Sequence, residues 1–204
     1  MVRVRNALLF LLLSVLWGSA FTAIKAGLAA FPPVLFAALR YDLAGVIVLA
    51  YAVVAVDHWR PRDRGEWLLV AIGSVLMIAA YHAFLFVGEQ GTTSAAAAII
   101  VSLSPVLTTA FARAFLPDER LTAIGLLGLL VGFVGVVVLS QPDPSNLLAA
   151  GTVSKGLVLL AAASFALGSV LTRRVDAELP IETMEAWSML GGALVMHAVS
   201  LGLG

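Results

Sequence analysis

The chain has 204 residues, of which 61% are hydrophobic and only 12% are charged, and its mean hydropathy is +1.05. Soluble domains average roughly 45–50% apolar and 25% charged residues, so this composition excludes a soluble globular fold and indicates an integral membrane protein. The net charge is zero, which provides no basic surface for nucleic acid. There is no cysteine, so disulfides and thiolate metal sites are excluded.

Apolar runs long enough to span a membrane follow one another along the chain. A helix needs about 20 apolar residues to cross a bilayer core of about 30 Å. Seven runs meet this length, at about 7–28, 33–56, 67–88, 93–116, 121–140, 153–172 and 181–203. The connections are too short to hold a soluble domain. We therefore expect an all-α, polytopic helical bundle with seven transmembrane helices, the first of them retained rather than cleaved as a signal peptide.

The basic residues lie at alternate ends of these runs. Nine of the twelve Lys and Arg residues fall at the N-terminus or in the connections on its side. This bias predicts a multi-pass protein of the cell membrane with a cytoplasmic N-terminus.

Two short segments near the ends of the chain resemble each other. Gly18-Ser19-Ala20-Phe21-Thr22 in the first run matches Gly168-Ser169-Val170-Leu171-Thr172 in the sixth, 150 positions later. A unit of five helices, being odd, would insert its two copies in opposite orientations, as in the inverted repeats of secondary transporters. We expect a first repeat over residues 1–141 and a partial second repeat over 152–204, which this chain does not complete. A chance match is the alternative.

Ionisable and polar residues gather in the predicted outer halves of the spans. The group comprises Lys25, Arg40, Tyr41, Asp42, Tyr81, His82 and Glu89. An arginine within a span costs roughly 2.5–3.5 kcal/mol to insert, so Arg40 should face protein or water. It could bind an anionic group of a substrate, pair with Asp42 or Glu89, or bond to carbonyls freed near Pro32-Pro33. We expect the aliphatic chain of Lys25 to extend so that its ammonium group reaches the outer lipid headgroups.

The remaining candidate residues lie near the middle of their spans. Trp17 and Phe21 share a helical face with Ser14, Gly18 and Lys25, and this mixture of aromatic, small and polar residues suits a cavity wall or a helix contact. His82 could carry a coupling proton or only bond a neighbouring helix. Ser102 and Pro105 share a face of the fourth run, where the proline should leave the Val101 carbonyl unpaired. In the fifth run, we expect helix packing, with self-association as a homodimer possible, at Gly125, Gly128, Gly132 and Gly135.

The order of these motifs resembles the EamA repeat of the drug/metabolite transporter superfamily. The matching elements are Trp17 to Phe21, Pro33 with Arg40, Tyr81, Gly91 to Ala95, Ser104-Pro105, Asp118 to Leu121 and the glycines of the fifth run. The resemblance implies a ten-helix fold of two inverted five-helix repeats around a central cavity, of which seven helices are present here. It also implies export of amino acids, metabolites or drugs.

The sequence therefore predicts a secondary-active transporter that alternates access around a central cavity. The expected substrate-binding residues are Trp17, Phe21, Arg40, Tyr81, His82, Ser102 and Pro105. There are no signatures of catalysis, metal binding, cofactors or nucleotide-driven pumping, so a proton or another ion would supply the coupling. The alternatives are a seven-helix sensor, which would need a lysine in the last span, a membrane enzyme, and a structural or regulatory subunit or non-functional fragment.

Overall fold

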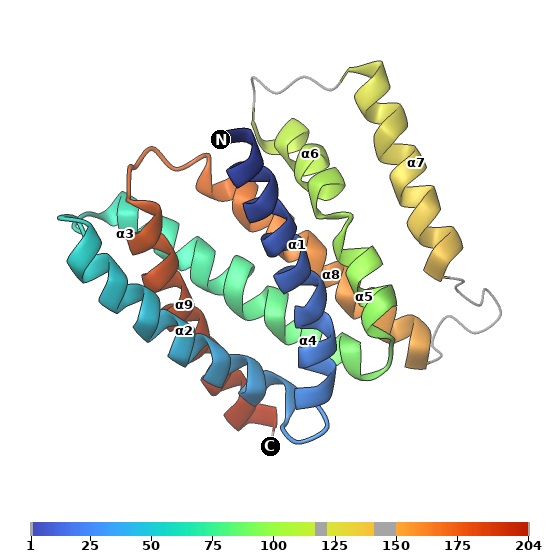
Figure 1. The fold of residues 1–204 in the computed structure, drawn as a ribbon, viewed down its shortest axis with the longest axis horizontal. Helices are drawn as coiled ribbons and strands as arrows, with labels where there is room; N and C mark the ends of the chain where they lie inside the picture. Colours follow the sequence, from blue (N-terminus) through green and yellow to red (C-terminus); the bar gives the residue numbers. More distant parts are fainter. Residues whose placement is uncertain (1, 117–121, 141–149, 204) are drawn as a thin grey trace.

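The computed structural model describes residues 2–116, 122–140 and 150–203, which form helices and short connections without strands (Figure 1). The elements are α1 (Val2–Gly27), α2 (Pro33–Ala55), α3 (Arg64–Ile72), η1 (Gly73–Ala80), α4 (Tyr81–Gln90), α5 (Ser94–Val101), α6 (Ser104–Phe115), α7 (Ala123–Ser140), α8 (Ala150–Thr172) and α9 (Ile181–Leu203). Every predicted apolar run coincides with one helix or with consecutive helices. The all-helical membrane fold is confirmed.

Five of the segments are long and apolar enough to cross a membrane. They are Val4–Gly27, Pro33–Ala55, Arg64–Gln90, Ser94–Phe115 and Gly151–Thr172. The segments α7 and α9 are the other two predicted spans, and for them membrane crossing stays a prediction. In Figure 1 the N-terminus and the α2–α3 and α8–α9 connections lie at one end of the bundle, while the α1–α2 and α4–α5 connections lie at the other. The predicted cytoplasmic basic residues of these connections therefore share one side.

The continuous segment α3–η1–α4 forms the centre of the bundle. It packs against α8, α9 and α2, and 44% of its most apolar window is buried, against 6% for α1. Its most buried large side chain, Phe86, lies in a core cluster with Met196 of α9 and Val158 of α8. Asp63 is the N-cap residue of this segment, because its carboxylate accepts a hydrogen bond from the Glu66 amide at 2.9 Å at the start of α3.

Glycines permit the closest approaches of these central helices. A Cβ atom added to Gly88 would lie 2.7 Å from the Ser154 carbonyl oxygen and 3.1 Å from the Val158 amide nitrogen of α8. One added to Gly192 of α9 would lie 2.4 Å from an Ile78 methyl group. These contacts are too short for any larger residue, so α4 and α8 meet almost backbone to backbone.

The glycines predicted to pack α7 behave differently. A Cβ atom at Gly128 or Gly135 would meet nothing within 4 Å among the described residues, and one at Gly132 would meet only Val106, at 3.5 Å. The amide of Gly125 donates to the Thr122 hydroxyl at 3.1 Å near the start of α7. Packing through these four glycines, and self-association through them, stay predictions.

The predicted fourth span is interrupted at Ser102 and Leu103, just before Pro105. Proline has no amide hydrogen, which removes one hydrogen bond from the helix. The expectation that the Val101 carbonyl is left unpaired is wrong, because the Ser104 hydroxyl donates to it at 2.7 Å. The nearby turn from Asp118 to Leu121, part of the family resemblance, lies outside the described residues.

Replacing Gly88 with alanine should destabilise the bundle by about 1–3 kcal/mol, because the new methyl group would overlap main-chain atoms that cannot move aside. Thermal unfolding of the purified protein in detergent would measure the loss. Gly18→Ala is the matched control, since Gly18 is also inside an apolar helix but meets nothing within 4 Å. Equal melting temperatures for the two variants would contradict the α4–α8 contact.

Candidate functional site

The best-defined polar contact within the bundle joins Tyr41 of α2 to His82 of α4. The Tyr41 hydroxyl lies 2.7 Å from His82 Nε2, and His82 Nδ1 lies 2.8 Å from the Ile78 carbonyl oxygen. A carbonyl can only accept, so Nδ1 carries the hydrogen, and in the neutral ring Nε2 accepts from the Tyr41 hydroxyl. Only 8% of His82 is exposed, and both ring nitrogens are satisfied.

Aromatic rings surround this hydrogen bond. The centroid of the His82 ring lies 4.5 Å from that of Tyr41, 4.5 Å from that of Tyr81 and 6.1 Å from that of Phe86. The Tyr81 and Phe165 ring centroids are 5.4 Å apart, and Phe165 belongs to α8. We call Tyr41, Tyr81, His82, Phe86 and Phe165 the aromatic–histidine cluster. It ties α2, α4 and α8 together.

The backbone changes conformation immediately before the cluster. The eight residues of η1 form a π-helix that ends at Ala80, directly before Tyr81 and His82. π-Helical segments are rare in proteins and are frequently found at functional sites. Since η1 packs on both α8 and α9, the π-helix sets the direction in which Tyr81 and His82 leave the central segment.

Arg40 lies beside the cluster with an exposed side chain. Its guanidinium carbon is 5.4 Å from the centroid of the Phe86 ring, and the Phe86 ring contacts that of His82. No carboxylate of a described residue forms a salt bridge with Arg40. Arg40 thus lies next to the cluster through Phe86, and a role in substrate binding stays a prediction for Arg40, Tyr81 and His82.

The partners suggested for Arg40 and Lys25 from sequence are wrong. Asp42 instead contacts His197 of α9, with 2.7 Å between the carboxylate oxygen and Nε2. Lys25 Nζ donates to the main-chain carbonyls of Glu89, Gln90 (3.1 Å) and Thr92 (2.8 Å). The ammonium group thus binds the carbonyls at the C-terminus of α4 rather than reaching the headgroups.

The other predicted site residues lie away from the cluster. Trp17 is 71% exposed, so no cavity wall surrounds it among the described helices. Phe21 packs on the edge of the hydrophobic core, and its carbonyl accepts a hydrogen bond from the Ser94 hydroxyl at 3.2 Å. Ser102 and Pro105 are exposed, and the Ser102 hydroxyl donates to the Ile99 carbonyl of its own helix at 2.6 Å. A role in substrate binding stays a prediction for these four.

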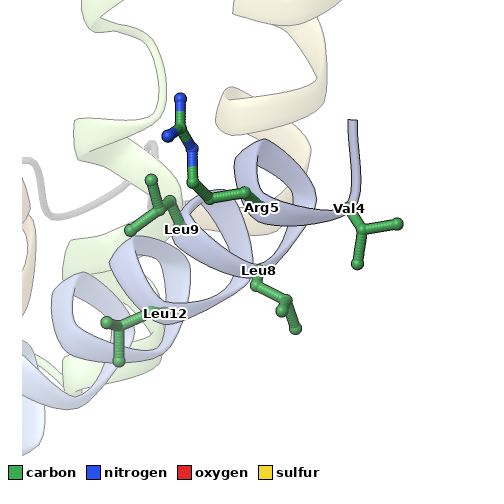
Figure 2. Close-up of a pocket in the computed structure, with 5 residues that line it drawn as sticks. All are labelled: Val4, Arg5, Leu8, Leu9 and Leu12. Carbon is green, nitrogen blue, oxygen red and sulfur yellow. The ribbon is translucent and has the colours of Figure 1, made fainter. Parts of the chain in front are cut away.

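Several surface cavities of the described bundle are lined by residues outside the cluster. Figure 2 shows one of about 540 Å³, an apolar groove lined by Val4, Arg5, Leu8, Leu9 and Leu12. All five residues belong to α1, so the groove is a surface feature of one helix. Another, of about 510 Å³, is lined by Trp59, Arg60, Pro61, Arg62, Trp67 and Trp187. Within the described ranges, no three His, Asp or Glu side chains come close enough together to hold a metal ion.

Sequence reasoning missed several members of the cluster. Phe86 and Phe165 are ordinary apolar residues of their helices, and no local signal distinguishes them. The contact between Asp42 and His197 joins residues 155 positions apart. From sequence, Tyr41 belongs only to the outer polar group, and its position directly after the intramembrane Arg40 is the signal that could identify it as a site residue.

Comparisons with known proteins agree with this architecture. Residues 5–141 match the model of the EamA-like transporter family. The chain is 33% identical over 131 residues to an uncharacterized transporter of Archaeoglobus fulgidus, covering 64% of this chain and 46% of that protein. It is 31% identical to a chloroplastic WAT1-related protein of Arabidopsis thaliana, covering 91% of this chain and 45% of the relative.

Two further comparisons extend over nearly the whole chain. The uncharacterized inner membrane transporter YedA of Escherichia coli is 29% identical, covering 93% of this chain and 60% of its own length. One crystal structure superposes with a TM-score of 0.63 at 25% identity, covering 92% of this chain and 63% of the other. The chain thus spans about half of the length of the relatives it matches. With the family model covering most of its residues, this helical membrane protein belongs to the EamA-like transporter family.

Proposed function

We propose that this chain forms the binding half of a secondary-active exporter for small organic solutes that carry a carboxylate, such as amino acids. The first repeat would comprise residues 1–141 and the second would begin near residue 152. Access would alternate between the two sides of the membrane around Arg40 and the aromatic–histidine cluster. A proton or another ion gradient would supply the energy, and the N-terminus would face the cytoplasm of a cell membrane.

The observation that carries this proposal is that Arg40 is exposed and forms no salt bridge with a described carboxylate. An arginine inside a span is costly to insert, by roughly 2.5–3.5 kcal/mol. Its contact with Phe86 at 5.4 Å recovers about 0.5–2 kcal/mol as a cation–π interaction. The planar guanidinium still has several N–H donors in the geometry that a carboxylate accepts. A substrate carboxylate would satisfy them.

The aromatic–histidine cluster supports binding of the rest of the solute. The half-buried rings of Tyr41, Tyr81 and Phe165 provide aromatic surface near the charge, and small-molecule sites typically combine apolar surface with a few polar groups. Because His82 is fixed at both nitrogens, the cluster can hold its shape without a ligand. Transport by YedA and the other relatives is implied by their names only, and it supports the same class of activity here.

Arg40→Ala should reduce transport of carboxylate-bearing solutes by at least about tenfold, because a hydrogen bond to a charged group is worth about 1.5–3 kcal/mol. The measurement is uptake of radiolabelled glutamate, threonine and tryptophan into everted membrane vesicles, with ethidium as a probe that lacks a carboxylate. Arg60→Ala is the matched control, since Arg60 also lies over an aromatic ring, that of Trp59 at 5.8 Å. Wild-type transport of every probe by Arg40→Ala would contradict the assignment. If the unmodified protein moves none of them, a structural or regulatory subunit becomes the better description.

Tyr41→Phe and His82→Phe should show a coupling free energy of about 0.6–1.7 kcal/mol in a double-mutant cycle, the range of interhelical hydrogen bonds in membranes. Each single variant removes one partner of the 2.7 Å bond, and the double variant removes both. Thermal unfolding in detergent measures the cycle. Additive effects of the two substitutions would show that the hydrogen bond does not form in the folded protein.

A further inference from the structure

Glu89 is the most unusual ionisable residue of the bundle. None of its surface is exposed, and neither carboxyl oxygen has a hydrogen-bond partner among the described residues. It is the penultimate residue of α4, where the helix dipole is negative and disfavours a second negative charge. Burying an unpaired carboxylate is far more costly than burying a neutral carboxylic acid.

The charged and polar groups around Glu89 are engaged elsewhere. On α1 the Lys25 ammonium contacts the main-chain carbonyl of Glu89, not its carboxyl group. On α5 the Ser94 hydroxyl, which lies beside the carboxyl group, donates to the Phe21 carbonyl at 3.2 Å. From α2, Arg40 lies over the Phe86 ring, one turn before Glu89.

The remaining neighbours also leave the carboxyl group without a partner. Tyr81 lies about two turns earlier on α4, the same helix as Glu89. On α8, Lys155 follows Ser154, the residue whose carbonyl faces Gly88, and it has an interaction of its own. None of these groups forms a hydrogen bond with the carboxyl oxygens of Glu89.

A proton fits this site better than a metal cation does. A metal ion would need several oxygen ligands, and the nearest main-chain carbonyls, those of Glu89, Gln90 and Thr92, already bind the Lys25 ammonium. A proton needs only one carboxyl oxygen, and it removes the cost of the buried charge.

We propose that Glu89 is the proton-binding residue that couples transport, and this inference rests on the function proposed above. In the conformation described here the carboxyl group is sealed and holds its proton. Separation of α1 from the end of α4, where Lys25 joins the two helices, admits water and lets the carboxyl group release the proton to that side. Rebinding takes one proton from water, and no covalent bond other than O–H forms or breaks.

Infrared spectroscopy of the purified protein in lipid tests the protonation state directly. At neutral pH the wild type should show a carboxylic-acid absorption that is lost in Glu89→Gln. Glu66→Gln is the matched control, because Glu66 is also buried, at 5% exposure, but accepts bonds from the Arg62 amide (2.6 Å) and His58 (3.0 Å). That variant should keep the absorption. Identical spectra for the wild type and Glu89→Gln would overturn the proposal. A carboxylic-acid absorption that appears only in Lys25→Met would overturn it too, because Glu89 would then be ionised as long as the Lys25 ammonium is present.

Transport in vesicles tests the coupling separately. For any amino acid that the wild type moves, Glu89→Gln should lose the acceleration by a pH gradient and should keep exchange of labelled for unlabelled solute. Loss of both gradient-driven flux and exchange, or retention of both, would overturn the coupling role. If the wild type moves no probe, the proposed function fails, and the infrared result still decides whether Glu89 holds a proton.

Discussion

The structure depends on one constraint, that a polar group within a bilayer must find its partner inside the protein. Several intramembrane hydroxyl groups, such as that of Ser14, bond a carbonyl of their own helix, whereas the larger polar side chains bond a group from another helix. Lys25 binds the carbonyls at the end of α4, Tyr41 donates to His82, and Asp42 contacts His197. The first two contacts join α1 and α2 to the central segment, and the third joins α9 to α2. In hydrocarbon their loss cannot be offset by water.

Arg40 of α2 and Glu89 of α4 depart from this pattern. Arg40 is a permanent cation whose only described contact is the face of an aromatic ring, and Glu89 is buried without any hydrogen bond. Neither residue stabilises the bundle in an obvious way, since both are costly to insert. We interpret one as the group that binds the anionic solute and the other as the group that carries the proton. In this interpretation, both residues lower the stability of the bundle and are retained because transport requires them.

The sequence predicted the architecture better than the site. Apolar runs and short connections were sufficient for the helices, because length and hydropathy are local properties. Helical spacing places Trp17 on one face with Phe21, but spacing alone does not tell which face meets another helix. The Trp17 side chain is in fact 71% exposed. The π-helix before Tyr81, the Ser104 hydroxyl that satisfies the Val101 carbonyl, and the distant pair of Asp42 and His197 depend on tertiary packing. No local pattern predicts them.

The central claim is that solute movement and proton movement are the same event in this protein. The most direct test is to reconstitute it in liposomes that enclose a pH-sensitive dye, and to add a transported amino acid in the absence of any imposed gradient. Our account predicts a change of internal pH that begins with the solute flux and scales with it. Solute flux with no change of internal pH would contradict it.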